Sequence, residues 1–300
     1  MKSTPLGYAF AIIAFTIFSV QDAVSKHLGM AYPPVLVAMF RYWAFALFAI
    51  LFAMRARGGL RAAAASKRPL LQILRGLMLA LQIPIAIAAF AKVGLAQSQA
   101  IFASGPLIVA LLSVPVLGEK VGWRRWTAIG VGLCGVLLIL SPSGDGFSPL
   151  VILPISTAVI GALYGLTTRL VSRVDGPMTS FFYIGTVGAV ALSIAGPFFW
   201  TPLAPSDWKW MILLCCTGIA GHFLLIKAYD NLDAVAVQPI TYLQLVLATG
   251  IAVVVFGEVL RLNMVIGATI VVGAGLFTVW RENVLARRNS PSAPSNNKQA

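Results

Sequence analysis

The feature that most constrains this chain is a succession of long apolar stretches that contain few charged residues. Ten such stretches can be drawn, at residues 7–28, 33–55, 71–92, 95–117, 123–141, 149–172, 178–199, 208–229, 234–256 and 263–281. A helix needs roughly 20 residues to cross the hydrocarbon core of a bilayer. Strands of a transmembrane barrel have about 10 residues of alternating pattern, so a barrel is excluded. We predict an all-α, polytopic membrane protein with ten transmembrane helices.

Charge supports this class and orients the chain. The net charge is +13, but charged residues make up only 10% of the sequence, against about 25% in soluble proteins. If the N-terminus is cytoplasmic, the inner segments hold 17 Lys and Arg residues and the outer ends hold four. Positive residues concentrate on the cytoplasmic side, so we predict that both termini are cytoplasmic. Basic residues placed in this way indicate topology, and we expect no nucleic-acid partner.

A duplicated motif divides the chain into two units. Val116-Leu117-Gly118-Glu119 returns 139 positions later as Val255-Phe256-Gly257-Glu258, each time before a glycine-rich apolar stretch. We predict two five-helix repeats, at 7–141 and 149–281, followed by a disordered cytoplasmic tail at 282–300. Because five is odd, the second repeat is inverted, and inverted repeats place a substrate site at their interface near the midplane. We interpret the two Gly-Glu pairs as matched structural corners that do not line this central cavity.

These features together resemble the drug/metabolite transporter superfamily, specifically its bacterial ten-span branch of duplicated EamA-type domains. Residues 22–26 (Asp-Ala-Val-Ser-Lys) and 40–42 (Phe-Arg-Tyr) also resemble the first and second spans of that family. The resemblance implies a secondary transporter of the bacterial inner membrane that works by alternating access between the repeats. It implies export of small metabolites, with neutral or aromatic amino acids favoured. The alternative is a carrier for riboflavin-, nucleoside- or S-adenosylmethionine-like metabolites.

Two remote alternatives belong to other classes. One is a channel, although the sequence has no ring of repeated charges and no filter motif. The other is an intramembrane protease in which Ser104 and His222 form a dyad. We expect no enzyme activity, no catalytic residue, no metal and no cofactor. The expected partners are a small-molecule substrate and the lipid bilayer, with the chain a monomer or weak homodimer.

Charged residues at membrane depth are functional candidates, since placing a charge there is costly. Asp22 and Arg41 lie at matching depths in the first two stretches, so we hypothesise that they contact each other. Lys26 follows Asp22 by one helical turn, on the same face. This group is interpreted either as a structural ion cluster or as an outer gate or coupling site. Its counterpart in the second repeat is weak, with Arg169 opposite Lys26.

Uncharged polar groups in the apolar stretches are the candidates for substrate binding, because a pocket for a small solute needs a few placed polar groups. Hydrogen bonding between helices is the competing interpretation of each one. Prolines in the third, fourth and ninth stretches are candidate hinges, with simple packing kinks as the alternative. The candidate substrate-binding residues are Gln82, Gln99, Ser104, Tyr164, His222, Gln238 and Tyr242, and the candidate hinges are Pro84, Pro106 and Pro239.

Overall fold

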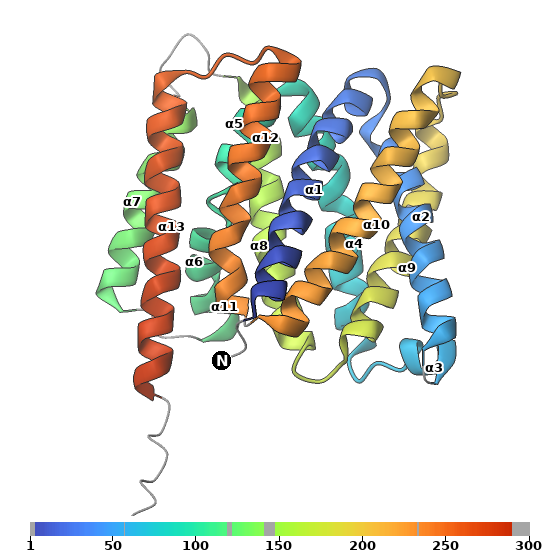
Figure 1. Ribbon diagram of the computed structural model, residues 1–300, viewed down its shortest axis with the longest axis horizontal. Helices are drawn as coiled ribbons and strands as arrows, with labels where there is room; N and C mark the ends of the chain where they lie inside the picture. The colour runs from blue at the N-terminus through green and yellow to red at the C-terminus, as the bar shows by residue number, and fades with distance from the viewer. Residues whose placement is uncertain (1–3, 57, 119–121, 141–147, 233, 290–300) are drawn as a thin grey trace, which may run out of the picture.

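The computed structural model describes residues 4–56, 58–118, 122–140, 148–232 and 234–289, and this part of the chain is almost entirely helical (Figure 1). The α-helices are α1 (Pro5–Ala31), α2 (Pro34–Arg55), α3 (Gly59–Ala64), α4 (Pro69–Lys92), α5 (Leu95–Phe102), α6 (Gly105–Leu117), α7 (Trp123–Leu140), α8 (Ile152–Val171), α9 (Pro177–Ala195), α10 (Trp208–Asn231), α11 (Ala234–Val237), α12 (Thr241–Phe256) and α13 (Leu262–Asn289). Short 3₁₀ segments are η1 (Pro149–Val151), η2 (Gly196–Phe199), η3 (Pro205–Asp207) and η4 (Gln238–Ile240).

These helices coincide with the stretches predicted from the sequence. In the described part of the chain, eight helical segments are long and apolar enough to cross a membrane. The other two predicted spans contain shorter apolar helices, Trp126–Leu140 and Thr241–Phe256. The short helix α3 was not predicted. Helix α13 continues to Asn289, so the expectation of a disordered tail from residue 282 is wrong over its first residues, and residues 290–300 lie outside the description.

Helix ends follow from local sequence. The hydroxyl of Thr4 accepts a hydrogen bond from the Gly7 amide at 3.1 Å and caps α1, and prolines occupy the first turn of α1, α2, α4 and α9. The duplicated motif ends a helix in both repeats. Gly118 and Gly257 have φ values of 68° and 64°, a left-handed conformation that terminates helices and favours glycine. The side chain and backbone of Glu119 lie outside the described residues, so only the second corner can be examined in full.

The helices pack in a pattern that exchanges the two halves. Helix α1 packs on α10 and α12 of the second half, while its counterpart α8 packs on α4 and α6 of the first. Helix α2 packs on α9 and α7 on α13, each pair joining equivalent elements. In Figure 1, α1 runs upward and α8 runs downward. The fold is therefore an inverted repeat, as the duplicated motif predicts.

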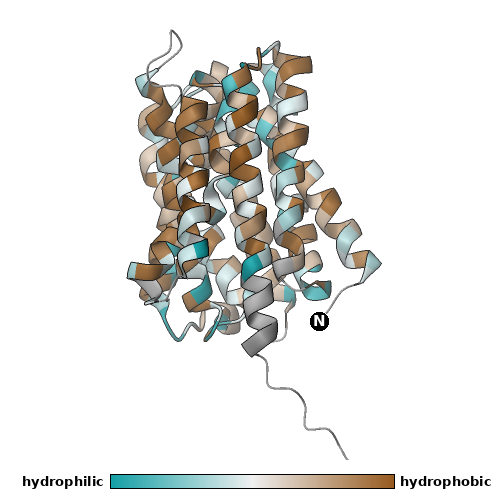
Figure 2. Ribbon diagram, turned by 90° about the vertical axis from the view of Figure 1, so that its left-hand side faces the viewer, coloured by the Kyte–Doolittle hydropathy of each residue, from teal (hydrophilic) through white to brown (hydrophobic). Residues whose placement is uncertain are grey.

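Apolar side chains cover the outside of the bundle. Leu70, Phe198, Val254 and Leu262 are 74–85% exposed, which is unfavourable in water but suits contact with lipid. Figure 2 shows hydrophobic residues along the sides of the helices. The exposed apolar surface and the long apolar helices agree with a polytopic membrane protein.

Equivalent loops are clamped by hydrogen bonds at the two ends of the bundle. Between α1 and α2, the Tyr32 hydroxyl donates to Asp207 Oδ2 at 2.6 Å and accepts from the Ala204 amide at 2.9 Å. Its hydrogen bond to Asp207 raises the pKa of the Tyr32 phenol above its ordinary value. This first clamp joins the α1–α2 loop to the loop before α10.

The second clamp lies between α8 and α9, the equivalent place in the inverted half. The Asp175 carboxylate accepts from Ser66 Oγ, from the Lys67 amide at 2.9 Å and from Gln72 Nε2 at 2.9 Å. Desolvation acts to raise the pKa of Asp175, but these hydrogen bonds outweigh it and the pKa lies below its ordinary value. The clamp joins the α8–α9 loop to the segment before α4.

Candidate functional site

A cavity of about 380 Å³ lies between the two halves. Helices α1, α2, α4, α5 and α6 of the first half line it, together with α8, α10 and α12 of the second. Its volume falls within the roughly 300–1,000 Å³ of small-molecule sites. We call it the central cavity, and it occupies the place where inverted repeats are expected to hold a substrate.

Two equivalent helices are interrupted beside this cavity. The fourth predicted span is divided into α5 and α6, with Pro106 in the first turn of α6 and on the cavity wall. The ninth is divided into α11, η4 and α12, and η4 contains Pro239. Interrupted helices at corresponding positions of two repeats are typical of transporter binding sites. Pro84, by contrast, is buried within the continuous helix α4. The hinge role of all three prolines stays a prediction.

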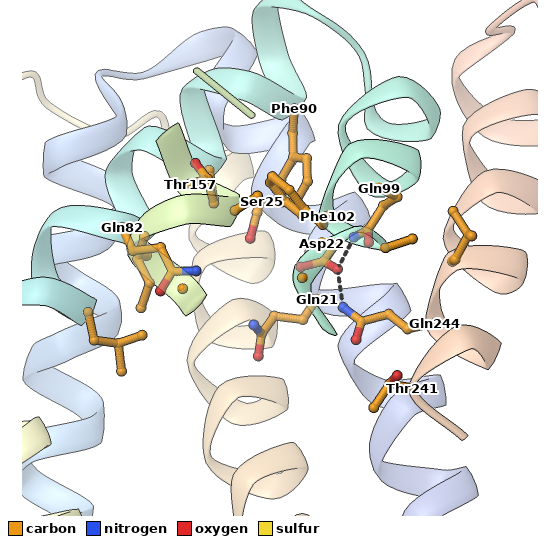
Figure 3. Close-up of a pocket in the computed structure, with 18 of the residues that line it drawn as sticks. Gln21, Asp22, Ser25, Gln82, Phe90, Gln99, Phe102, Thr157, Thr241 and Gln244 are labelled. Carbon is orange, nitrogen blue, oxygen red and sulfur yellow. Dashed lines mark hydrogen bonds between the residues drawn. The ribbon is translucent and has the colours of Figure 1, made fainter. Parts of the chain in front are cut away.

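Asp22 lies on the cavity wall and bridges the two halves. Its Oδ2 accepts a hydrogen bond at 2.6 Å from Gln99 Nε2 on α5 and another at 2.6 Å from Gln244 Nε2 on α12 (Figure 3). The residue is 8% exposed. Two amide donors satisfy part of the buried carboxylate, as burial of a charged group requires.

Arg41 lines the same cavity from α2, but the hypothesised contact with Asp22 is wrong. The described residues include no carboxylate within 4 Å of the Arg41 guanidinium, and Asp22 is held by glutamines instead. Matching depth in two helices did not determine which side chains meet. The cavity wall therefore carries two opposite charges that attract each other electrostatically but form no ion pair within 4 Å.

Lys26 has a partner that the sequence gave no reason to expect. Its Nζ forms an ion pair with Glu258 Oε1, from the duplicated motif of the second half. The Glu258 carboxylate also accepts from the amides of Leu95 at 2.7 Å and Ala96 at 3.0 Å. The Gly-Glu corner thus has a partner in the first half, beyond the role of a helix terminus, and Lys26 does not line the central cavity.

Four buried polar atoms on the cavity wall have no hydrogen-bond partner among the described residues. They are Gln21 Oε1 and Ser25 Oγ on α1, Gln82 Oε1 on α4, and the Tyr242 hydroxyl on α12. Figure 3 shows Gln21 and Gln82 on different sides of the cavity. Buried polar atoms are normally hydrogen-bonded, because leaving one unpaired costs about 1–3 kcal/mol. All four atoms are buried in this structure, and the Tyr242 hydroxyl lies against Gly275 of α13, so a side-chain rotation would be needed to bring Gln21, Ser25 or Gln82 to a solute in the cavity.

Gln82 has room for its amide because the facing helix has a glycine. A Cβ at Gly161 on α8 would lie 2.6 Å from Gln82 Nε2. This contact is shorter than real Cβ contacts, so any larger residue at 161 would displace the amide. Gly161 itself lines the cavity.

Aromatic rings complete the wall. The rings of Phe90 and Phe102 lie 5.6 Å apart between centroids, near the Asp22 side of the cavity in Figure 3. His222 lines the cavity from α10, with its Nδ1 2.8 Å from the Gly218 carbonyl oxygen of its own helix. Its ring also packs against Phe18 at a centroid distance of 5.1 Å. The cavity therefore combines flat apolar surfaces with amide and charged groups.

Two candidate residues are not brought to this cavity. Ser104 is buried and donates to the Ile101 carbonyl oxygen at 2.6 Å, so it satisfies the broken backbone between α5 and α6. Tyr164 lines a neighbouring hollow of about 290 Å³, and its ring lies 5.7 Å from Arg75 Cζ. The side chain of Gln238 lies outside the described residues. Gln82, Gln99, His222 and Tyr242 do meet in the central cavity, as do Asp22 and Arg41.

Gln21, Ser25 and Glu258 were not among the candidate site residues predicted from the sequence. Gln21 and Ser25 are four residues apart on α1, so their spacing could have placed them on the face that carries Asp22. Glu258 gave no comparable signal, since its partner Lys26 is 232 positions away in the chain. The contact depends on the packing of the two repeats.

Known proteins resemble this chain over nearly its whole length. An S-adenosylmethionine uptake transporter from Rickettsia bellii is 26% identical, with 94% of this chain and 96% of the relative covered. A riboflavin transporter from Rhizobium johnstonii is 28% identical, with 96% and 94% covered. A pseudopaline exporter from Pseudomonas aeruginosa is 26% identical, with 89% and 94% covered. These relatives are named as transporters, and none of the three is named as an enzyme.

Structure and family agree with this similarity. A solved crystal structure of a protein superposes with a TM-score of 0.60 and 21% identity, over 94% of this chain and 96% of the other, which indicates a shared fold. With its apolar helices and bacterial relatives, the chain is a multi-pass membrane protein of bacterial type. The sequence pattern of one family matches residues 5–141 and again 148–280. The chain belongs to the EamA-like transporter family.

Proposed function

We propose that this transporter carries a metabolite that joins an amino-acid zwitterion to a heteroaromatic ring, of the S-adenosylmethionine class, and that the substrate binds in the central cavity. The repeats at 7–141 and 149–281 are the units that move in alternating access. The observation that carries the proposal is the cavity wall, where unpaired amide oxygens stand beside two opposite charges.

The charges favour a zwitterion. Asp22 and Arg41 both line the cavity, and no described carboxylate lies within 4 Å of Arg41. A solute with an ammonium and a carboxylate group can compensate both charges at once. Such compensation lowers the cost of burying the two charges, because Asp22 has two amide donors and Arg41 has no ion pair among the described residues.

The remaining wall favours a ring with polar edges. Phe90 and Phe102 offer flat surfaces for stacking. Gln21 and Gln82 each present an unpaired carbonyl oxygen, which can accept from an exocyclic amine or a ring N–H. A simple amino acid would leave these groups unused, and the space of about 380 Å³ suits a larger solute.

The relatives support the same substrate class. They are named for S-adenosylmethionine, riboflavin and pseudopaline, which favours the alternative of nucleoside- or riboflavin-like substrates over the neutral and aromatic amino acids expected first. Riboflavin is the second candidate, because its ring edges could use the unpaired amides of Gln21 and Gln82. The relatives include uptake transporters and an exporter, so they do not favour the expected direction of export.

Orientation follows the distribution of Lys and Arg. We place the chain in the bacterial inner membrane with both termini cytoplasmic, because positive residues concentrate on that side. In this orientation the Lys26–Glu258 ion pair lies toward the outer side, near the C-terminal ends of α1 and α12, which are at the upper end of Figure 1.

The test is counterflow in proteoliposomes. Vesicles that contain the purified protein are loaded with unlabelled S-adenosylmethionine, and uptake of the labelled compound is measured. Riboflavin, adenosine, phenylalanine and alanine are tested as competitors of this uptake and, in separate vesicles, for their own exchange. We expect saturable exchange of S-adenosylmethionine, with weaker competition from the uncharged adenosine and riboflavin. Exchange of phenylalanine or alanine without exchange of S-adenosylmethionine would overturn the proposal. Exchange of riboflavin alone would establish the second candidate.

A further inference from the structure

The central cavity has one further hollow toward each end of the bundle. The hollow of about 290 Å³ that contains Tyr164 shares Pro106 and Val109 with the central cavity. A third, of about 430 Å³, lies at the other end and is lined by Lys92, Gly94 and Arg261 among others. We call it the vestibule. The vestibule shares no lining residue with the central cavity, so the two are separate hollows, whereas the hollow that contains Tyr164 adjoins the cavity.

The Glu258 carboxylate lies in the part of the protein that separates the cavity from the vestibule. It binds Lys26 and the amides of Leu95 and Ala96, which begin α5. Lys26 and Glu258 both line the vestibule, and their side chains are 8% and 17% exposed. Lys26 follows Asp22 of the cavity by four residues, or about 6 Å along α1. One turn of helix therefore separates the cavity from this contact.

Local structure prepares the contact on both sides. Gly257 ends α12 in the left-handed conformation, directly before Glu258. Gly94 precedes α5 with a φ of 113°, and a Cβ there would lie 3.0 Å from Glu258 Oε2. The amides at a helix N-terminus have no partner within their own helix, and a carboxylate there is also favoured by the helix dipole. Glu258 thus caps a helix of the other repeat.

We propose that Glu258 is the gate residue that closes the central cavity on the vestibule side. Its carboxylate ties the corner between α12 and α13 to α1 and α5, so this end opens when the carboxylate leaves Lys26 and the α5 amides. Glu258 touches no substrate in this role and acts by setting which side of the membrane the cavity faces. The inference rests on the alternating access of the proposed function, and it does not depend on the identity of the substrate.

The gate can open because water can replace the partners that the Glu258 carboxylate and the Lys26 ammonium lose. Several polar and charged side chains line the vestibule besides the ion pair itself, among them Lys92, Gln97 and Asn263. When the carboxylate is released, Glu258 and Lys26 reach water there and do not remain as buried unpaired charges. The closed state is stabilised by one ion pair and two charge-assisted hydrogen bonds, a reversible contact.

Side-specific labelling tests the gate without any substrate. In a background with Cys134, Cys215 and Cys216 replaced by Ser, Thr157→Cys provides a thiol on the cavity wall. A membrane-impermeant thiosulfonate reagent is applied to intact cells and to inverted vesicles. We expect slow labelling from the vestibule side, accelerated about tenfold by Glu258→Gln and more by Glu258→Ala. We expect a smaller increase in the labelling rate for Lys26→Met, because Glu258 still accepts hydrogen bonds from the amides of Leu95 and Ala96.

The matched control is Lys227→Met, which removes the exposed ion pair with Asp230 at a site away from the cavity. It is expected to leave the labelling rate unchanged. Unchanged labelling in folded Glu258→Gln and Glu258→Ala proteins would overturn the proposal. If these variants fail to give a monodisperse peak on gel filtration, Lys26→Met serves as the test. An unchanged labelling rate in that variant would reject the gate. A failure of S-adenosylmethionine counterflow leaves this result unaffected, so the two proposals fail separately.

Discussion

The first helices of the two halves, α1 and α8, have equivalent places in the fold and different chemistry. Both cross the centre of the molecule and both line the central cavity. Counted back from Pro34 and Pro177, which begin α2 and α9, Asp22 corresponds to Gly165 and Lys26 to Arg169. Helix α1 thus carries a carboxylate where α8 carries no side chain.

This difference separates what the repeat provides from what each copy adds. The shared backbone places a hollow between the halves, beside the interrupted helices of both repeats. The unlike side chains decide what the hollow can bind. The cavity face of α1 holds Gln21, Asp22 and Ser25. The cavity face of α8 holds the smaller side chains of Thr157, Ala158 and Ala162, together with Gly161.

The strongest test of the comparison is Asp22→Asn. We expect the kcat/KM for S-adenosylmethionine to fall about 10- to 100-fold, because hydrogen bonds to a charged group contribute about 1.5–3 kcal/mol and 1.4 kcal/mol is tenfold. Initial rates in proteoliposomes measure this, with protein content matched by quantitative gel analysis. Adding Gly165→Asp is expected not to restore transport. Wild-type rates in the single variant would mean that α1 and α8 do not differ in function.

A smaller loss is expected for Gln82→Ala, which removes an unpaired amide that faces α8. The kcat/KM should fall about fivefold, since a neutral hydrogen bond contributes about 1 kcal/mol. The same transport assay measures this change. Thr269→Ala on α13 is the control, because among the described residues its hydroxyl bonds only to the Val265 carbonyl oxygen of its own helix. An equal loss in both variants would show that the effect does not come from the cavity.

Gly165→Ser probes the α8 side of the comparison. The nearest atom to a Cβ at this position is Val109 Cγ2, at 3.9 Å, so a serine fits without displacement. We expect transport within about twofold of the wild type, as for a substitution that changes free energies by less than about 0.5 kcal/mol. A loss as large as that of Asp22→Asn would break the comparison, because position 165 would then matter as much as position 22.

The smallest expected effect concerns the two loop clamps, which respond to pH at opposite ends of the scale. The folded pKa of Asp175 lies below its ordinary value of about 3.9. Its contribution to stability is therefore present above the ordinary pKa and is lost as pH falls through the folded pKa. We expect the difference in Tm between wild type and Asp175→Asn to shrink under acid conditions.

Tyr32 has the opposite sign. Its folded pKa is raised, so its contribution is present below the ordinary value of about 10 and is lost as pH rises through the folded pKa. The Tm of Tyr32→Phe should approach that of the wild type at alkaline pH. Thermal unfolding of the detergent-solubilised protein measures both variants. A pH-independent Tm difference for either one would mean that its clamp does not titrate.

Much of the fold could be predicted because it depends on local sequence. Long apolar stretches set the helices, the duplicated Gly-Glu pairs mark two helix ends in the left-handed conformation, and prolines mark the interruptions beside the cavity. The same local patterns identified Asp22, Arg41 and several glutamines as polar groups within the membrane. They did not predict the helical extension of α13 to Asn289, because the polar sequence there lacks the apolar pattern used to draw the spans.

The sequence by itself determined the membrane class, the helices, the inverted duplication and most of the polar residues of the site. Tertiary structure alone decided their partners: Asp22 with Gln99 and Gln244, and Lys26 with Glu258. The physical reason is that hydrophobic periodicity specifies which face of a helix is apolar and leaves open the neighbour and register that this face meets. A polar contact between helices far apart in the chain exists only once the two repeats have packed.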